Sequence, residues 1–312
     1  MHYAGLIYDD SRHYIDHLAP LCALLGWPLI TCEPSVAILA RKYYPDLEVI
    51  EQGLWDLKLP PCIVACDSKP LLRAAFPNQS CKLLWLPHGN SDKNSVFEQL
   101  GEIALTSWKQ MTDRIHSTRT VSVGNFRWEY FLKHQKFYQN MIHFPQKGKK
   151  ILYAPTWDDS ENNCSFWKAF PRLVNHLPKD CHLLVKLHPN TLQKYAAELE
   201  VLIGRYTKNV YFLPEIPPIY PILGNCDAYI GDMSSVGYDF LTFDRPMYFL
   251  NAKPHLPLHA CGWGIEPEGF CLRPDPFSKV RKATYQHTFD PVPSWEVFKR
   301  YLAYTLTTAT RP

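Results

Sequence analysis

The chain has little glycine, little net charge and no long apolar run. Its 312 residues include 14 Gly against 27 Pro, which predicts stiff loop entries rather than flexible linkers. The formal net charge of +3 does not indicate a nucleic acid as a partner. The longest uncharged apolar stretch, 18–32, is interrupted by two Pro and one Gly, and it is shorter than the about 20 residues of a spanning helix. We therefore expect a soluble or peripheral protein.

The amino-terminal residues lack the basic segment of a secretory signal peptide and become acidic at Asp9 and Asp10. The sequence therefore predicts a cytoplasmic protein, with the inner face of the cytoplasmic membrane as an alternative location. The 10 Cys are scattered, and most lie in apolar runs as Cys62 and Cys66 do, which is typical of buried free thiols. No second Cys or His pair follows with zinc-site spacing, so we expect no zinc site.

Strand-like and helix-like segments alternate along the whole chain. Apolar runs such as 82–86 and 151–154 predict strands, whereas amphipathic stretches such as 192–206 and 294–308 predict helices. This alternation is typical of an α/β fold with mostly parallel sheets. The periodicity breaks near 144–150. We therefore expect two Rossmann-like, doubly wound domains that face each other across a cleft. Their predicted limits are 1–146 and 147–293, followed by a carboxyl-terminal helix over 294–312 that packs back on the first domain.

Polar residues follow two predicted strands at their carboxyl ends, where open α/β sheets bind ligands. His88 lies between Pro87 and Gly89 after an apolar strand, and a His on such a tight turn can act as a general base. Thr156 and Trp157 follow the strand 151–154, and we expect them to face the cleft. A plain loop histidine and a plain strand exit are the alternatives at these positions.

Two further strand ends carry groups that suit a phosphate. Lys186 and His188 lie two residues apart, so they point to the same side of an extended strand. Ser234 and Ser235 follow Asp232 where an apolar strand turns into a helix, and this places hydroxyls and backbone N–H groups together. Ordinary helix capping is the alternative for these serines, and it is compatible with phosphate binding.

Five short motifs occur in a characteristic order: PHG at 87–89, VGNFRWEYF at 123–131, YAPTW at 153–157, KLHPN at 186–190 and GDMSSVGYDF at 231–240. In this order they resemble the CDP-glycerol and CDP-ribitol phosphotransferases, which build wall teichoic acids and some capsules. The resemblance covers about residues 80–250. It implies a GT-B fold with an amino-terminal acceptor domain and a nucleotide-binding carboxyl-terminal domain.

The resemblance also implies an activity, namely transfer of a polyol phosphate from a CDP-polyol to a hydroxyl of a glycan or lipid-linked acceptor, with release of CMP. No cofactor is implied besides this donor substrate. The implied catalytic residues are His88 as general base, His188 at the pyrophosphate and Asp232 at the end of its strand. The resemblance implies Thr156, Trp157, Ser234 and Ser235 as substrate-binding residues. Besides these, we expect Gly89, Lys186 and Glu215 to bind the substrate, and Glu215 could serve either enzymatic function.

The sequence departs from the family pattern at three places. Asp158 stands where the family usually has Arg, Met233 stands where it has Tyr, and 261–271 differs from the segment that helps shape the donor site. Two alternatives therefore stay open. One is a GT-B glycosyltransferase that uses a nucleotide sugar, with Glu215 at the ribose. The other is a non-catalytic member that binds a nucleotide. We predict no metal ligands.

The stretch 108–150 is rich in Lys and Arg, with aromatic residues between them. A basic amphipathic helix here would suit contact with an anionic membrane. The alternative is an ordinary helix between the domains that packs its aromatic stripe on the core. The sequence leaves both interpretations open.

Overall fold

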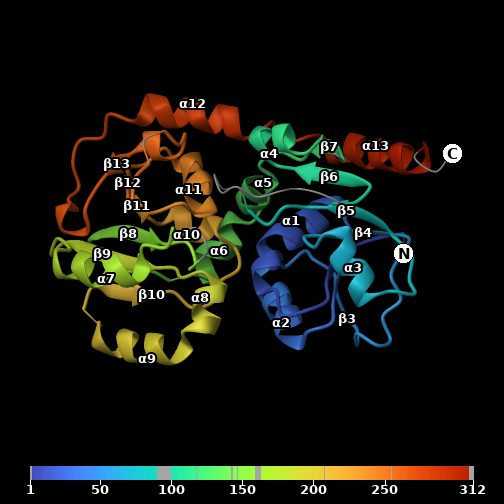
Figure 1. The fold of residues 1–312 in the computed structure, drawn as a ribbon, viewed down its shortest axis with the longest axis horizontal. Coiled ribbons are helices and arrows are strands. Elements are labelled where there is room, and N and C mark those ends of the chain that lie inside the picture. Colours follow the sequence, from blue (N-terminus) through green and yellow to red (C-terminus); the bar gives the residue numbers. More distant parts are fainter. Residues whose placement is uncertain are drawn as a thin grey trace. The chain divides into compact units, whose positions relative to one another are not determined.

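The structure is a computed structural model that describes residues 2–89, 100–116, 118–141, 143–145, 147–158, 163–206, 208–253 and 255–308. The chain forms two compact units. Unit 1 consists of 1–88, 95–134 and 288–312, and unit 2 of 89–94 and 135–287. Figure 1 labels their helices and strands.

A seven-stranded parallel sheet forms the centre of unit 1, in the order β3-β2-β1-β4-β5-β6-β7. Its strands are β1 (Tyr3–Ile7), β2 (Leu29–Thr31), β3 (Val49–Glu51), β4 (Cys62–Ala65), β5 (Lys82–Trp85), β6 (Ile103–Thr106) and β7 (Arg119–Ser122). The central strands are apolar throughout, because both faces of a parallel sheet are covered. Leu6, Val64 and Leu84 are accordingly fully buried.

The helices of unit 1 are α1 (Ile15–Leu25), α2 (Pro34–Tyr43), α3 (Lys69–Ala75), α4 (Lys109–Arg114), α5 (Phe126–Lys133) and α13 (Trp295–Thr308), with a 3-10 turn at Arg12–Tyr14. The strand order reverses between β1 and β4. Since crossovers between parallel strands are right-handed, α1 and α2 cover one face and α3 the other. The last helix, α13, belongs to this unit: Lys82 donates a hydrogen bond to the carbonyl of Leu306.

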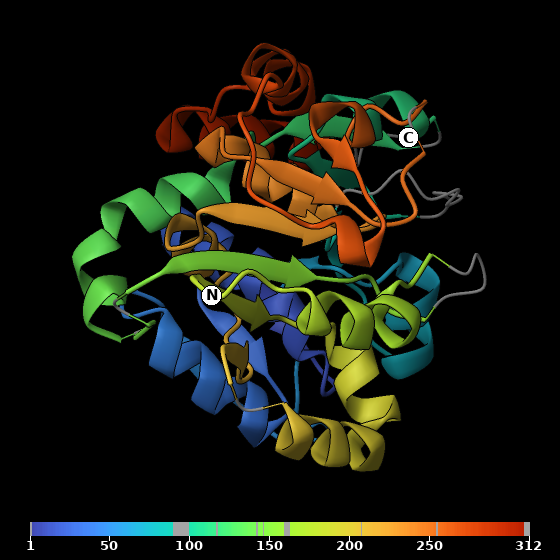
Figure 2. The same ribbon diagram turned by 90° about the vertical axis from the view of Figure 1, so that its left-hand side faces the viewer.

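Unit 2 contains a six-stranded parallel sheet in the order β10-β9-β8-β11-β12-β13, and Figure 2 shows its strands running in one direction. The strands are β8 (Lys149–Ala154), β9 (Cys181–Val185), β10 (Val210–Phe212), β11 (Ala228–Gly231), β12 (Met247–Phe249) and β13 (Trp263–Gly264). Here the order reverses between β8 and β11, which makes the carboxyl ends of these two strands the expected ligand edge.

The helices of unit 2 are α6 (Gln135–Met141), α7 (Phe166–Asn175), α8 (Pro189–Lys194), α9 (Ala196–Arg205), α10 (Tyr220–Gly224), α11 (Ser235–Phe240) and α12 (Ser278–Thr288). Short 3-10 turns lie at Leu241–Phe243, His259–Cys261 and Pro267–Gly269. The core forms where α7 packs on the sheet. There the rings of Phe166 and Phe170 stack with that of Tyr153 on β8, with centroids 6.4 Å apart in both pairs.

One sequence expectation about helices is wrong. The amphipathic stretch 192–206 is not one helix, because α8 ends at Lys194 and α9 begins at Ala196. Tyr195 between them donates its hydroxyl to Asp158 and leaves the helical conformation. The basic stretch 108–150 contains α4, β7, α5, α6 and the start of β8.

A buried ion pair removes one cation of the basic stretch from the surface. Arg127, counted from the sequence among its cations, is 7% exposed and lies 2.9 Å from Asp16 of α1. The hydroxyl of Tyr44 donates to the same carboxylate at 3.0 Å. Trp108 and Tyr138 of the stretch are also buried. These side chains therefore contribute to the core rather than to a surface.

The fold class predicted from the sequence is confirmed: the chain is an α/β protein with two doubly wound parallel sheets. The divergent segment 261–271 adds the edge strand β13 to the second sheet. The predicted domain limits of 1–146, 147–293 and 294–312 stay a prediction, because the units are groups of contacts and not pieces shown to fold alone. All ten cysteines are free thiols, and six of them are buried.

Candidate functional site

A buried carboxylate joins the ends of β8 and β11, where the strand order of unit 2 reverses. Asp232 directly follows β11 and is 1% exposed. Its Oδ1 accepts the backbone N–H of Thr156 at 2.7 Å. Its Oδ2 accepts the N–H and the hydroxyl of Ser165 at 2.9 and 2.8 Å. Both oxygens therefore hold the two ends of the segment between β8 and α7, which is a positioning role.

Gly231, the last residue of β11, leaves room for a buried tyrosine beneath this turn. The hydroxyl of Tyr229 lies 2.0 Å from the place that a Cβ on Gly231 would occupy. A side chain at position 231 is therefore incompatible with this packing. The requirement is steric and concerns the approach of Tyr229, not the backbone conformation.

The ring of His188 has a defined orientation. His188 caps α8, and its Nδ1 accepts the backbone N–H of Asn190 at 3.1 Å. Because Nδ1 is the acceptor, the proton of the neutral ring lies on Nε2. His188 thus holds an N–H donor on the side of the ring away from its own helix. Hydrogen-bond donation to a phosphate oxygen suits this arrangement.

Trp157 and His188 lie together at the carboxyl ends of β8 and β9. Their ring centroids are 6.2 Å apart, and Trp157 remains 37% exposed. A cavity of about 240 Å³ adjoins them, lined by Trp157, Asp158, Asn190, Thr191, Gln193, Lys194 and Tyr195. An exposed indole beside a cavity offers a stacking surface for a planar ring.

Asp158 occupies the position where the related enzymes usually carry Arg, and it is paired. Its Oδ2 lies 2.9 Å from Lys194 Nζ and accepts the Tyr195 hydroxyl at 2.7 Å. These two hydrogen bonds hold the pKa of the carboxyl below its usual value. A cation therefore still lines this cavity, but it comes from α8 and is balanced by the acid.

The serines predicted for phosphate binding begin α11. Ser234 is the N-cap, and its Oγ accepts the N–H of Val236 at 3.4 Å. Ser235 lies against Gly89, which groups with unit 2: a Cβ on Gly89 would stand 3.1 Å from Ser235 Oγ. The capping interpretation is therefore correct for Ser234. It leaves the Ser235 hydroxyl beside the Gly89 backbone.

The remaining two predicted residues of unit 2 follow other strands. Lys186 comes directly after β9, next to β8, and is half-buried. Glu215 follows β10, which β9 separates from β8, and it is also half-buried. Lys186 therefore belongs to the same strand-end region as Thr156, whereas Glu215 lies two strands from the reversal point.

In unit 1, His88 follows β5 and contacts two aromatic rings. Its ring centroid is 5.3 Å from that of His13 and 4.9 Å from that of Tyr14. His88 keeps an exposed surface, but protein atoms around the ring remove much of its hydration. This desolvation, with a smaller repulsion from His13, lowers the pKa of His88 to about 4. The ring is therefore neutral at physiological pH.

Sequence analysis missed the residues around His88. The Tyr14 hydroxyl donates to Asp67 Oδ1 at 3.3 Å, and Asp67 follows β4 at the point where the strand order of unit 1 reverses. Burial, together with repulsion from Asp9, raises the pKa of Asp67 to about 6. The strand-end rule that selected His88 would also have selected Asp67. No local signal marks His13 or Tyr14.

Two features are absent from the part of the chain that the structure describes. No three His, Cys, Asp or Glu side chains gather there in a way that could hold a metal ion. In the same part of the chain, no helix is both long and apolar enough to cross a bilayer.

Comparison with known proteins identifies the region that carries the site of unit 2. Residues 126–253 match the model of the CDP-glycerol:poly(glycerophosphate) glycerophosphotransferase family. The matched region includes Thr156, Trp157, His188, Asp232 and Ser235. The resemblance stated from the motifs is thus confirmed. His88 lies outside the matched residues.

A curated protein that is similar to part of this chain is a teichoic acid glycerol-phosphate primase from Bacillus spizizenii. It is 36% identical over 107 residues, which are 34% of this chain and 26% of that protein. The match therefore spans about a quarter of the relative.

Solved structures share the fold over nearly the whole chain. A structure of the wall teichoic acid polymerase TagF has a TM-score of 0.63 at 14% identity and covers 100% of this chain and 90% of that one. UDP-GlcNAc 2-epimerase from Methanocaldococcus jannaschii has a TM-score of 0.59 at 12% identity, with 97% and 100% covered. At such identities the likeness concerns the fold.

Proposed function

We propose that the chain transfers a polyol phosphate from a CDP-polyol, such as CDP-glycerol, to a hydroxyl of a glycan or lipid-linked acceptor. The observation that carries this proposal is the family match over 126–253, because it contains the residues gathered at the carboxyl ends of β8, β9 and β11. Two similar proteins agree with it, namely the glycerol-phosphate primase and the polymerase TagF, whose crystals were soaked with CDPG.

In the proposed reaction the acceptor oxygen attacks the phosphorus that bears the polyol. A new P–O bond forms, the pyrophosphate P–O bond breaks, and CMP leaves with the bonding electrons. His88 accepts the proton of the acceptor hydroxyl. Its pKa of about 4 leaves the ring neutral and able to accept, and a bound dianionic donor would raise that pKa toward neutrality. Phosphoryl transfer otherwise depends on positioning and on charge stabilisation.

The residues of unit 2 take the donor in this proposal. His188 donates Nε2–H to the pyrophosphate, and Lys186, Ser235 and the Gly89 backbone offer further donors. Trp157 stacks on the cytosine ring in the adjoining cavity, with Thr156 held beside it by Asp232. Asp232 itself acts by positioning, since its oxygens already accept three hydrogen bonds.

Calorimetric titration of the full chain with CMP, CDP-glycerol, UDP and UDP-sugars tests the donor. Selective cytidine binding that Ser235→Trp abolishes supports the proposal. A preference for uridine would favour a glycosyltransferase, with Glu215 at the ribose. Failure to bind either nucleotide would contradict both enzymatic functions.

The proposed base is tested with a matched histidine pair. His88→Ala should reduce turnover by about 10²–10⁴-fold, the usual contribution of a general base, with little change in CMP affinity. His116→Ala, the same change at an exposed histidine of unit 1, should leave turnover unchanged. Equal activity of the two variants would refute the assignment. A chain that binds CMP but shows no turnover with any acceptor would support the non-catalytic alternative.

A membrane contact through 108–150 and a location at the inner face of the cytoplasmic membrane are also proposals. Exposed residues of this stretch such as Leu132, Lys133 and Lys136 support them, whereas Trp108, Arg127 and Tyr138 are buried. Co-flotation with anionic vesicles, with Lys133→Glu and Lys136→Glu together as the variant, tests both.

A further inference from the structure

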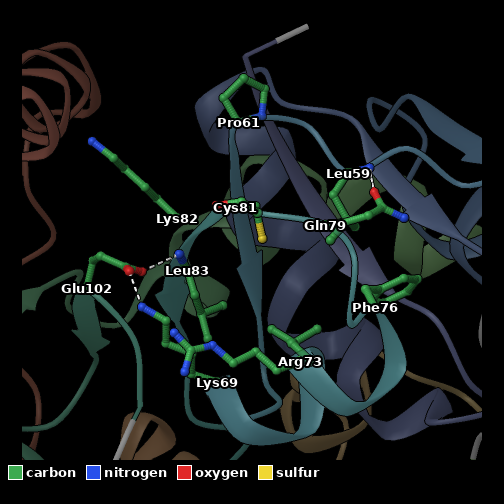
Figure 3. A pocket seen from close by; sticks show the side chains of 12 residues that line it. Leu59, Pro61, Lys69, Arg73, Phe76, Gln79, Cys81, Lys82, Leu83 and Glu102 are labelled. Carbon is green, nitrogen blue, oxygen red and sulfur yellow. Dashed lines mark hydrogen bonds and ion pairs between the residues drawn. The ribbon is translucent and has the colours of Figure 1, made fainter.

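Unit 1 contains a cavity of about 420 Å³ at the edge of the sheet opposite His88 (Figure 3). Pro61 precedes β4, Lys82 begins β5 and Glu102 precedes β6, so the cavity lies at the amino ends of these strands. His88 follows the carboxyl end of β5. Six residues of nearly extended chain separate it from Lys82, which corresponds to roughly 20 Å at about 3.3 Å per residue. The cavity is therefore separate from the proposed catalytic base.

The rim of the cavity carries excess positive charge. Its cations are Lys69, Arg73 and Lys82, and its acid is Glu102. Glu102 is already engaged, because one oxygen pairs with Lys69 Nζ and the other accepts the N–H of Leu83 at 2.6 Å. With this pair neutral, the rim retains a charge of about +2, which complements a phosphate monoester of charge about −1.5 to −2.

Arg73 is the group best suited to hold the anion. It lies one helical turn after Lys69 on α3, so the two side chains share a face of the helix, and Figure 3 shows both directed to the same end of the cavity. Among the residues that the structure describes, no hydrogen bond or ion pair engages the Arg73 guanidinium. Lys82 Nζ, by contrast, is bonded to Leu306. The planar guanidinium can bind two phosphate oxygens at once.

The interior of the cavity is apolar. Leu72 and Phe76 from the end of α3 are each 5% exposed, and Leu59 faces them from the preceding loop. Cys81 also lines the cavity, and burial together with the nearby Glu102 raises the pKa of its thiol, so the sulfur remains neutral at physiological pH. This lining suits a short hydrocarbon rather than a sugar.

One glutamine side chain fixes the wall. Gln79 accepts the N–H of Leu59 at 2.7 Å and donates to the carbonyl of Leu57 at 2.8 Å. These bonds fasten the loop before β4 to the loop before β5. The cavity is thus formed before a ligand arrives, as small-molecule sites usually are.

From these observations we propose that this cavity is a second ligand site, which binds a phosphate monoester carrying an apolar substituent. Arg73 holds the phosphate. Leu59, Leu72 and Phe76 surround the substituent.

Calorimetric titration of the full chain with hexyl phosphate tests this site. We expect saturable binding of hexyl phosphate at one site, at least tenfold weaker binding of inorganic phosphate, and no binding of hexyltrimethylammonium. Arg73→Gln should weaken the binding of hexyl phosphate at least tenfold, because a charge-assisted hydrogen bond is worth about 1.5–3 kcal/mol. The affinity of Arg73→Lys for hexyl phosphate should lie between those of the unchanged chain and Arg73→Gln. Arg205→Gln, which removes the same charge from the exposed end of α9, should bind like the unchanged chain.

The outcomes separate this site from the proposed donor site. Binding that survives saturating CMP and is lost in Arg73→Gln supports the second site, whether or not the chain shows transferase activity. Binding that CMP displaces, or that Arg73→Gln leaves intact, overturns it, as does the absence of saturable binding. Vesicles containing phosphatidic acid identify the source: binding to them indicates a lipid, and binding to hexyl phosphate alone indicates a small soluble ester.

Discussion

Replacing Asp232 should destabilise unit 2 before it affects any chemical step. The carboxylate is buried and accepts three hydrogen bonds of 2.7–2.9 Å, two of them from backbone N–H groups of Thr156 and Ser165. Hydrogen bonds to a charged group contribute about 1.5–3 kcal/mol each, and such contributions are not additive. Asp232→Ala also leaves two buried donors without an acceptor. We therefore expect a loss of about 3–5 kcal/mol in the free energy of unfolding.

Asp232→Asn should cost less, about 1–2 kcal/mol, because its carbonyl oxygen can still accept the N–H of Thr156. Urea unfolding followed by tryptophan fluorescence measures both variants. Asp180→Ala, an exposed aspartate of the same unit, serves as the control and should change stability by less than about 0.5 kcal/mol. If Asp232→Ala unfolded at the same urea concentration as the control while turnover was lost, Asp232 would act on substrate and the positioning argument would be wrong.

Three further outcomes follow from the structure. If His88 is the base, kcat/KM should not fall near pH 6.5, because the pKa of His88 is about 4, and a loss of activity near pH 6.5 that His88→Gln removes would contradict this pKa. The unfolded histidine binds a proton more readily, so His88 lowers the stability of the fold as the pH falls from about 6.5 to 4. Asp16→Ala removes the carboxylate that pairs with the buried Arg127 and should cost about 3–5 kcal/mol in thermal or urea unfolding. A cost below about 1 kcal/mol would show that the pair is solvated. Gly231→Ala should lower the free energy of unfolding by about 1–3 kcal/mol. Combination with Tyr229→Phe should restore only part of this loss, because the ring carbon Cζ of Tyr229 lies 2.4 Å from the added Cβ; full recovery of stability would indicate that the hydroxyl alone obstructs the Cβ.

The sheets were predictable because their strands are short apolar runs bounded by Pro, Asp and Lys, and buried parallel strands have that composition. The helical stretch 192–206 was predicted as continuous because its apolar stripe does continue through Tyr195. At Tyr195, where α8 ends, the hydroxyl donates a tertiary hydrogen bond to Asp158, 37 residues away in sequence, and no local pattern indicates this contact.

The candidate site likewise contains residues that the sequence predicted and residues whose role it could not predict. Thr156, His188 and Ser235 could be selected because each directly follows an apolar strand or begins the next helix. The role of Asp232 could not, since its sequence position shows a strand end but not the three donors that surround it. Tyr14, which links His88 to Asp67, lies in a turn with no periodicity, and only the strand order brings it to them.

The last helix has a consequence for synthesis on the ribosome. Residues 135–287 of unit 2 are contiguous, so they can complete their sheet as soon as they emerge. Unit 1 must wait for residues that are made after unit 2, because Arg119 of β7 meets the Tyr301 hydroxyl and Gly124 lies against the Asp290 and Pro291 backbone. At about 5–20 residues per second, the first sheet therefore stays partly uncovered for roughly 10–40 s after its strands are made. During that interval the apolar surface that α13 will cover is open to chaperones and to aggregation.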